Sequence, residues 1–214
     1  MKRATSMPTM HPAVGKPLPA DFLQHLTQLQ AAYLQEVDPI RQSGFSGGPE
    51  RWRAERSPII GAVRASGSLL DVGCANGYLL ECLMRWACEV GMTLTPFGVD
   101  CSEGLISLAR ERMPMFRDHF HVANAWGWIP PQRFQYVYCV FDCVPRETLG
   151  DFVEHLLSNV VEPGGRLILG AYGSRSRQEV PARVDELLNG LGYRVAGSTV
   201  AGEPQTARFA WVDT

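Results

Sequence analysis

Short apolar segments and amphipathic helical segments alternate along most of this 214-residue chain, and this alternation constrains its fold more than any other feature. Apolar runs with the length and composition of buried strands occur at 68–72, 94–99, 120–123, 136–141 and 166–171. Segments with helical periodicity follow several of these runs, at 77–90, 103–112 and 146–159. Strands joined through helices of this length pair in parallel, because each helix returns the chain to the same edge of the sheet.

The end of the chain has a different pattern. After an expected helix near 180–188, two apolar runs at 193–200 and 206–212 are separated by only a few residues around Gly202. This connection is too short for a crossover helix, so the two strands must pair antiparallel. We therefore predict an α/β fold: a seven-stranded, doubly wound, mostly parallel sheet with a C-terminal antiparallel hairpin and an N-terminal helical lid.

The first part of the chain divides into two expected regions. Residues 1–18 have no periodicity and are predicted to form a flexible tail. Residues 19–65 are predicted to form a helical lid or cap, with one helix that Pro39 ends and a second that is kinked near Pro58. Arg51, Arg53 and Arg56 in the second helix are expected to share one solvated face. Residues 66–214 then form a single Rossmann-like domain.

Composition excludes several classes of protein. The formal net charge is −2, so neither nucleic acid nor a membrane surface is an expected partner. The chain has no apolar stretch of spanning length and no apolar secretory signal near its start, which indicates a cytoplasmic protein. Its only lysines are Lys2 and Lys16, which excludes a P-loop and a pyridoxal site.

The metal-binding residue types are not arranged as a metal site. Six cysteines are scattered without a CxxC pair and are expected to be reduced core residues. His119 and His121 alternate on one strand, but no third ligand is evident. We therefore predict no metal site.

The turn after the first expected strand, Asp71-Val-Gly-Cys-Ala-Asn-Gly77, is glycine-rich and leads into a helix. Glycines let the backbone approach a ligand closely, and the helix that follows presents unpaired N–H groups. A dinucleotide fingerprint would need glycine at positions 75 and 78, where this chain has Ala75 and Tyr78. The turn therefore disfavours NAD.

An acidic residue ends the second expected strand. Asp100 follows Phe97-Gly-Val, in the position where a carboxylate can accept hydrogen bonds from both ribose hydroxyls of a nucleoside. The same residue is also suited to cap the helix that follows. An acid in this position therefore suits the ribose of a nucleoside ligand.

These motifs resemble the class I S-adenosylmethionine-dependent methyltransferases over about residues 66–214. Leu69–Gly77 is similar to the first motif of that family, Gly98–Asp100 to its ribose-binding acid, and Glu162–Leu167 to the turn before its fifth strand. Asn124 stands where the family more often has an aspartate for the adenine amino group. The resemblance implies S-adenosylmethionine as cofactor. The cofactor-binding residues that it implies are Asp71, Gly73, Cys74, Ala75, Asn76, Gly77, Asp100, Cys101, Asn124, Ala125 and Phe141.

Other parts of the expected site are less defined. Cys101 and Trp126 either flank the adenine ring or pack in the core, while Tyr33 and Arg41 are candidate contacts for the amino-acid end of the cofactor. If the acceptor must lose a proton, the candidate catalytic residues are Asp142, His121 and Tyr172.

The predicted reaction is methyl transfer to a small-molecule acceptor, with S-adenosylhomocysteine as product. The segment after the fourth strand, Phe141-Asp-Cys-Val144, lacks the (D/N)PP(Y/F) signature of nucleic-acid amino methyltransferases. Three alternatives stay open: other chemistry of the sulfonium group, a non-catalytic sensor or partner subunit that binds the same cofactor, and a nicotinamide oxidoreductase. The sequence does not specify an oligomeric state.

Overall fold

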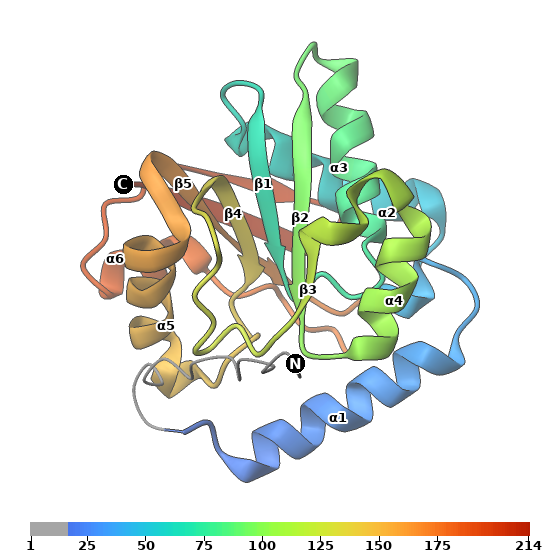
Figure 1. Cartoon of the computed structure of the whole chain (residues 1–214). Helices are drawn as coiled ribbons and strands as arrows, with labels where there is room; N and C mark the ends of the chain where they lie inside the picture. The colour runs from blue at the N-terminus through green and yellow to red at the C-terminus, as the bar shows by residue number, and fades with distance from the viewer. Residues whose placement is uncertain (1–16) are drawn as a thin grey trace, which may run out of the picture.

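Seven strands form one mixed sheet in the computed structural model, which describes residues 17–214. The order across the sheet is β3-β2-β1-β4-β5-β7-β6 (Figure 1). The strands are β1 Gly67–Val72, β2 Leu94–Asp100, β3 Phe120–Val122, β4 Phe134–Val140, β5 Val161–Tyr172, β6 Gly197–Ala201 and β7 Ala207–Asp213. The tail predicted at 1–18 lies almost entirely outside the described residues.

Strand directions confirm the predicted fold class. The first five strands pair in parallel, whereas β7 pairs antiparallel with both β5 and β6. Leu69 and Leu70 are adjacent in the central strand β1 and are both fully buried, although neighbouring side chains point to opposite faces. Both faces of the sheet are therefore covered, as expected for a parallel sheet.

Helices lie on the two faces of the sheet and across one of its edges. The α-helices are α1 Ala20–Gln35, α2 Pro49–Arg56, α3 Tyr78–Glu89, α4 Glu103–Arg112, α5 Leu149–His155 and α6 Val184–Gly190. The remaining helical turns are η1 Arg41–Ser43, η2 Ser57–Ala62, η3 Pro114–His119, η4 Arg146–Thr148 and the π-helical η5 Leu156–Val160.

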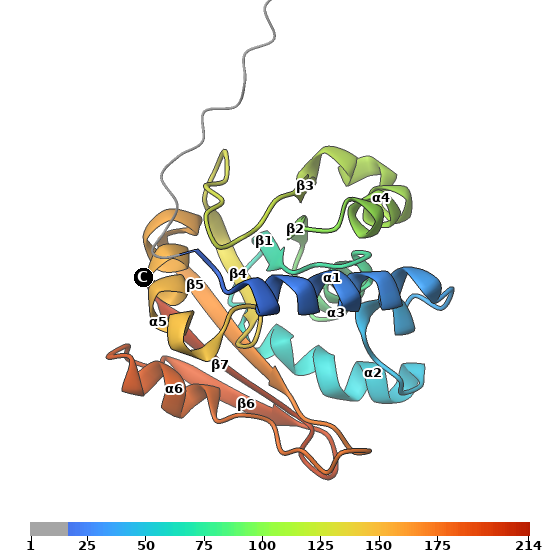
Figure 2. The ribbon, with the colours of Figure 1, turned by 90° about the horizontal axis from the view of Figure 1, so that it is seen from below.

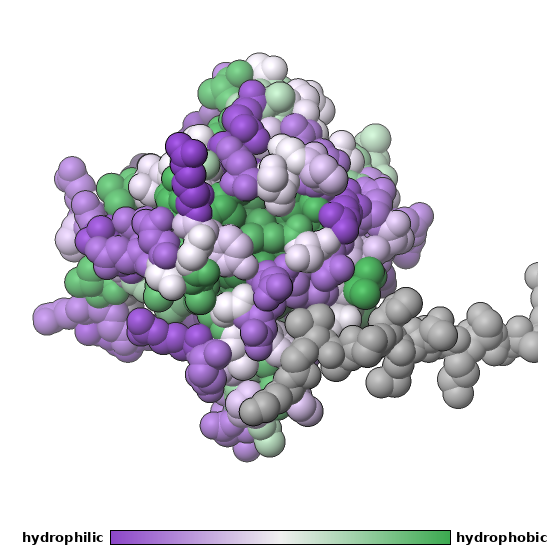
Figure 3. Space-filling view, turned by 90° about the vertical axis from the view of Figure 1, so that its left-hand side faces the viewer, coloured by the Kyte–Doolittle hydropathy of each residue, from purple (hydrophilic) through white to green (hydrophobic). Residues whose placement is uncertain are grey.

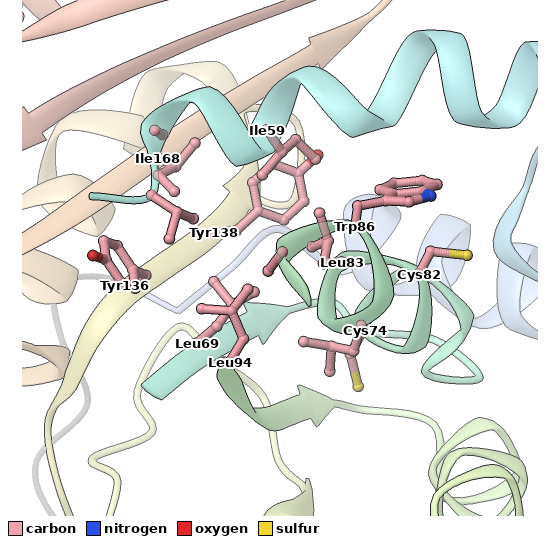
Figure 4. Packing of buried hydrophobic residues seen from close by; sticks show 14 of the residues in the cluster. Ile59, Leu69, Cys74, Cys82, Leu83, Trp86, Leu94, Tyr136, Tyr138 and Ile168 are labelled. Atoms are coloured by element: carbon pink, nitrogen blue, oxygen red, sulfur yellow. The ribbon is translucent and has the colours of Figure 1, made fainter. Parts of the chain in front are cut away.

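A separate hydrophobic core lies on each face of the sheet. One core joins α2, η2, α3 and α4 to the sheet, and Figure 4 shows its side chains meeting, with Leu83 and Trp86 of α3 close to Ile59 of η2 and Tyr138 of β4. The other core joins α5, η5 and α6 to the opposite face. Figure 3 looks onto the side of the molecule that carries α5 and α6, where hydrophilic residues surround a central apolar area.

Several element boundaries differ from the sequence-based prediction, among them the helix expected near 180–188, which is α6 at Val184–Gly190. The second N-terminal helix ends at Arg56, because Pro58 lacks the N–H that would continue it, and η2 follows. The expected turn at 162–165 lies inside β5, where the pairing register with β4 shifts and Gly164 has φ +77°. β6 starts at Gly197 rather than at 193, since Tyr193 and Val195 pack against the core of α5 and α6 instead of pairing.

Helix α1 runs across the edge where the parallel strands end, as Figures 1 and 2 show. None of its residues is buried. Its anchors include Gln30, whose Nε2 lies 2.7 Å from Sγ of Cys101, and Leu34, which packs beside Gly104 of α4. This edge holds the residues that the sequence analysis assigned to ligand binding.

No helix among residues 17–214 combines the length and apolar character needed to cross a membrane.

Candidate functional site

The glycine turn between β1 and α3 has the left-handed backbone that its sequence predicts. Gly73 has φ +79° and Gly77 has φ +72°. A Cβ at Gly73 would point into open space, so the turn leaves room for a ligand there. Ala75 also adopts a positive φ, +46°, although it carries a Cβ. The chain keeps the shape of a glycine turn at a position where its sequence has alanine.

Asp100 ends β2 beside this turn and is held in a fixed orientation. Its Oδ2 accepts a hydrogen bond from the backbone N–H of Ala75 at 3.0 Å, and its Oδ1 accepts one from the N–H of Ser102 at 2.9 Å. Burial raises the pKa of Asp100 above its ordinary value, and these backbone hydrogen bonds oppose the rise. Each carboxylate oxygen keeps a lone pair for a ligand hydroxyl. The cap of α4 is Ser102 rather than Asp100.

Asp71, near the end of β1, is a buried acid without a hydrogen-bond partner among the described residues. The residue is 3% exposed. Burial, and then the negative charge of Asp100, raise the pKa of Asp71 to about 8. A buried carboxyl group in this state lacks a compensating cation, so it suits a ligand that brings one, such as an ammonium group.

Asn76 ties the turn to the N-terminal segment. Its fully buried side chain donates to the backbone oxygen of Pro39 at 3.0 Å and to Oε1 of Gln42 at 2.9 Å. Its Oδ1 accepts from the N–H of Tyr78 at the start of α3. Because these bonds occupy the side chain, only the backbone of Asn76 is left to contact a ligand.

The cysteines of the site differ from one another in exposure. Cys74 is buried and its Sγ packs under Gly98, so this residue too presents only its backbone to the ligand side. Cys101 is exposed below α1. All six cysteines are free, but Cys88 and Cys101 are exposed, so the expectation that all are core residues is wrong for these two.

Residues assigned to the adenine side lie after β3 and β4. Asn124 is exposed, and its Oδ1 accepts from the N–H of Trp126 at 3.0 Å. Ala125 and Phe141 are half-buried at the margin of the core that α5 covers. Trp126 is 5% exposed and stacks with Phe152, with ring centroids 6.2 Å apart, so its side chain is part of that core.

Tyr33 of α1 reaches into the site from above the strand ends. Its hydroxyl lies against Gly44, where a Cβ would clash with it. Burial raises the pKa of Tyr33, and the negative charges of Asp142 and Asp100 raise it further. The positive charge of Arg56 opposes the rise. The hydroxyl therefore stands among the charged groups of several separate elements. Arg41, the other N-terminal candidate, is 60% exposed and faces Glu36 at 3.9 Å.

The three candidate catalytic residues do not form one cluster. His121 of β3 and Tyr172 of β5 are separated by four strand spacings, which is about 19 Å. Asp142 follows β4, between them.

Their proton affinities also differ. Burial raises the pKa of Asp142. Burial, together with the charges of Arg110 and His119, lowers the pKa of His121, whose ring packs against Trp128. Burial raises the pKa of Tyr172, whose hydroxyl lies 2.9 Å from that of Tyr138. Tyr172 therefore stays neutral and is a poor proton acceptor at neutral pH.

Arg56 is a buried residue whose environment sequence reasoning missed. The prediction that it shares a solvated face with Arg51 and Arg53 is wrong, because Arg56 is 6% exposed. The available signal was its position four residues after Trp52, which places both side chains on one face of α2. Trp52 is 2% exposed, so that face points inward.

A cleft of about 740 Å³ lies beside the site, between α2 and the β6–β7 hairpin. It is lined by Glu50, Arg51, Ala54, Glu55, Arg175, Val200, Ala201, Gly202, Glu203 and Gln205. No residue of the glycine turn lines it, and neither does Asp100. This cleft is therefore separate from the nucleoside site. Among the described residues, no group of three or more His, Cys, Asp or Glu side chains is placed to hold a metal ion.

Comparison with known families identifies the class of domain. Residues 69–165, from β1 into β5, match the family described as "Methyltransferase domain". With the sheet order, the antiparallel β7 and the glycine turn, this match shows that the chain carries a class I S-adenosylmethionine-dependent methyltransferase domain. The cofactor of this class is S-adenosylmethionine.

The chain is similar to trans-aconitate 2-methyltransferase of Rhodopseudomonas palustris strain HaA2, with 30% identity over 143 residues that make up 64% of this chain and 46% of the relative. It therefore spans less than half the length of the curated relatives it matches. Among solved structures, the N-methyltransferase NodS of Bradyrhizobium japonicum WM9 gives a TM-score of 0.65 at 16% identity, covering 90% of this chain and 98% of NodS. The 1,6-didemethyltoxoflavin-N1-methyltransferase of Burkholderia thailandensis gives 0.64 at 14% identity, covering 94% and 93%. At these identities the two structures establish the fold alone.

The residues at the strand edge fit this cofactor. The open space over Gly73 gives room for its amino-acid end, and the unpartnered Asp71 suits its ammonium group. The free lone pairs of Asp100 suit the two ribose hydroxyls.

Proposed function

We propose that this protein transfers a methyl group from S-adenosylmethionine to a small-molecule acceptor and releases S-adenosylhomocysteine. The observation that carries the proposal is the pair formed by Asp71 and Asp100. One acid is buried and unpartnered, and the other is fixed by backbone N–H groups at the edge of an open glycine turn. Together they suit an adenosine with a cationic amino-acid end and no phosphate.

The geometry supports a specific set of cofactor contacts. Asp100 would hold the ribose, Asp71 the ammonium group, and the backbone of residues 73–77 the amino-acid end. Asn124, Ala125 and Phe141 would border the adenine, with Cys101 at its edge. When bound, S-adenosylmethionine supplies a methyl group that its sulfonium already activates, so the main task of the protein is to align the acceptor and exclude water.

Residues 19–65 would act as a lid over the strand edge. Two contacts support this role: Asn76 joins the glycine turn to Pro39 and Gln42, and Gln30 joins α1 to Cys101. Because α1 has no buried residue, it can leave the edge at little cost in buried apolar surface. Such a segment suits a site that must open for the cofactor and close for the reaction.

Asp142 is the best placed of the three candidate proton acceptors. It follows β4 at the edge of the sheet where the parallel strands end, and its negative charge raises the pKa of Tyr33 in the lid. Its raised pKa brings it closer to neutral pH, which favours a general base. His121 lies at the far edge of the parallel strands, and Tyr172 is held neutral by burial.

The acceptor is proposed to be a small anionic molecule rather than nucleic acid. The name of the curated relatives states that they methylate trans-aconitate, which is a carboxylate. The net charge of −2 does not suit a polyanionic partner the size of a nucleic acid.

The test is to incubate the protein with S-adenosylmethionine and a panel of small carboxylic acids, including trans-aconitate, and to measure S-adenosylhomocysteine. We expect acceptor-dependent product, and Asp142→Asn should slow the reaction only where the methylated atom carries a proton, which a carboxylate oxygen at neutral pH does not. A protein that binds S-adenosylmethionine but produces S-adenosylhomocysteine with no acceptor would contradict the proposal.

A further inference from the structure

Arg56, at the end of α2, is enclosed by aromatic rings. Its Cζ lies 4.0 Å from the ring centroid of Trp52, 4.2 Å from that of Phe45 and 4.4 Å from that of Tyr172. The residue is 6% exposed. These rings come from α2, from the loop before it and from the end of β5, so three separate segments hold the guanidinium in one place. We call these four residues the aromatic–arginine cluster.

The hydrogen-bonding capacity of Arg56 is unused. A guanidinium has five N–H donors, yet none of them donates to any residue of the described chain, and Nη1 is fully enclosed without a partner. The nearest carboxylate is that of Glu55, whose Oε2 lies 3.8 Å from Nη1, beyond hydrogen-bond distance. Glu55 is already bonded to Arg51 at 2.6 Å. Aromatic rings attract the charge of a guanidinium but leave its N–H groups without acceptors.

The cluster lies against the proposed methyl-transfer site. Tyr172, which contacts the guanidinium, is the last residue of β5 and lies at the edge of the sheet where the parallel strands end. The charge of Arg56 also acts on Tyr33, the lid residue that responds to Asp100 and Asp142. Arg56 is thus a buried cation facing a region that is otherwise acidic. A buried cation with free donors in such a place suits an anionic ligand group.

We propose that Arg56 binds a carboxylate group of one of the two reactants. A planar guanidinium can donate two parallel hydrogen bonds to a carboxylate. The guanidinium of Arg56 is held in place and its N–H groups are free, so it can bind a carboxylate in this way. The carboxylate has two possible sources, the amino-acid end of the cofactor or the acceptor. The acceptor source rests on the proposed function, whereas the cofactor source rests only on the class of domain.

Two adenosine thioethers distinguish the sources. S-adenosylhomocysteine has the amino-acid end, and 5′-methylthioadenosine lacks it. We would titrate both by calorimetry into the wild-type protein, Arg56→Met and Arg56→Lys. Arg53→Met is the matched control, because Arg53 lies on the same helix but is exposed and paired with Glu89.

If the carboxylate belongs to the cofactor, Arg56→Met lowers the affinity for S-adenosylhomocysteine about 10- to 100-fold, as expected for hydrogen bonds between charged groups. The affinity for 5′-methylthioadenosine then stays unchanged. If the acceptor is the source, both affinities stay unchanged, and KM for the carboxylate acceptor rises at least about tenfold while kcat is kept. In either case Arg56→Lys recovers part of the loss and Arg53→Met has no effect.

Two results would overturn the inference. One is an equal loss of affinity for both thioethers in Arg56→Met, which indicates a structural role. Partial unfolding of the variant does not obscure this result, because the ratio of the two affinities does not depend on the folded fraction. The other is unchanged affinity for both together with no effect on any carboxylate acceptor. A wild-type protein that binds S-adenosylhomocysteine but methylates no acceptor would refute the proposed function, while the comparison of the two thioethers would still test Arg56.

Discussion

The proposed site has two halves that are built differently. The cofactor half consists of the glycine turn 71–77 and Asp100, which lie within 30 residues of sequence and are fixed by backbone hydrogen bonds and backbone dihedrals. The other half consists of Asp142, Tyr33 and the aromatic–arginine cluster, whose residues come from distant segments and are positioned by side-chain packing. A binding site made by the backbone leaves a local sequence signature, whereas one made by packing between distant segments does not.

Removing the acid of the cofactor half should have the largest effect. Asp100→Ala removes the carboxylate that we propose accepts hydrogen bonds from both ribose hydroxyls. At about 1.5–3 kcal/mol for each hydrogen bond to a charged group, S-adenosylhomocysteine affinity should fall by about 10²- to 10⁴-fold. Calorimetry measures this, with Asp118→Ala as the control at an exposed carboxylate. A loss below about threefold would show that the cofactor half does not bind the ribose.

The second prediction concerns the proton on Asp71. Because its pKa is raised to about 8, free protein at neutral pH holds the proton, and an ammonium group nearby expels it. S-adenosylhomocysteine affinity should therefore rise with pH between 6 and 8, by at most about tenfold per unit, with proton release visible in buffers of different ionisation enthalpy. Asp71→Asn should abolish the release. Binding that takes up protons would refute this assignment.

The same group makes the stability of the free protein depend on pH. The native state holds a proton that the unfolded chain, with an ordinary aspartate pKa near 3.9, has already lost. Stability should fall as the pH rises from about 4 to about 8 and then level off, as far as Asp71 contributes. Urea unfolding of the wild type and Asp71→Asn measures that contribution, and identical pH profiles would refute it.

A further prediction concerns the packing beneath the turn. A Cβ at Gly98 would lie 2.6 Å from Sγ of Cys74 and 2.7 Å from the ring of Phe120. Gly98→Ala should therefore destabilise the fold by about 1–3 kcal/mol, as for other overpacked cores. Gly61→Ala is the control, since a Cβ there would point into open space. Adding Cys74→Ala to Gly98→Ala should restore part of the lost stability, because it removes the clashing sulfur. If stability is not restored, the contact with Cys74 is not the source of the strain.

The smallest expected effect is at Ala75. Its φ of +46° is unfavourable for a residue with a Cβ, and glycine adopts it freely. Since glycine also makes the unfolded chain more flexible, the net gain from Ala75→Gly should be at most about 1 kcal/mol. Ala75→Val should destabilise the protein. Denaturant midpoints measure both, and a destabilising Ala75→Gly would mean that the side chain has a packing role.

The same contrast explains what the sequence could predict. The succession of strands and helices along the chain, the antiparallel hairpin and the positions of Gly73 and Asp100 could be predicted, because they depend on local periodicity and turn chemistry. The burial of Arg56 was missed, because the rings of Phe45 and Tyr172 that enclose it are 11 residues before it and 116 residues after it along the chain. Asn76 was expected to face the ligand, but its side chain binds the N-terminal segment, and no local pattern indicates such a partner.

The most direct test of the central claim is a parallel calorimetric titration of the wild-type protein with S-adenosylmethionine, S-adenosylhomocysteine and NAD. We predict binding of the first two at micromolar concentrations, and none of NAD, because Asp71 and Asp100 suit a cationic nucleoside and Tyr78 stands where a dinucleotide turn needs glycine. Binding of NAD alone, or of none of the three, would contradict the account.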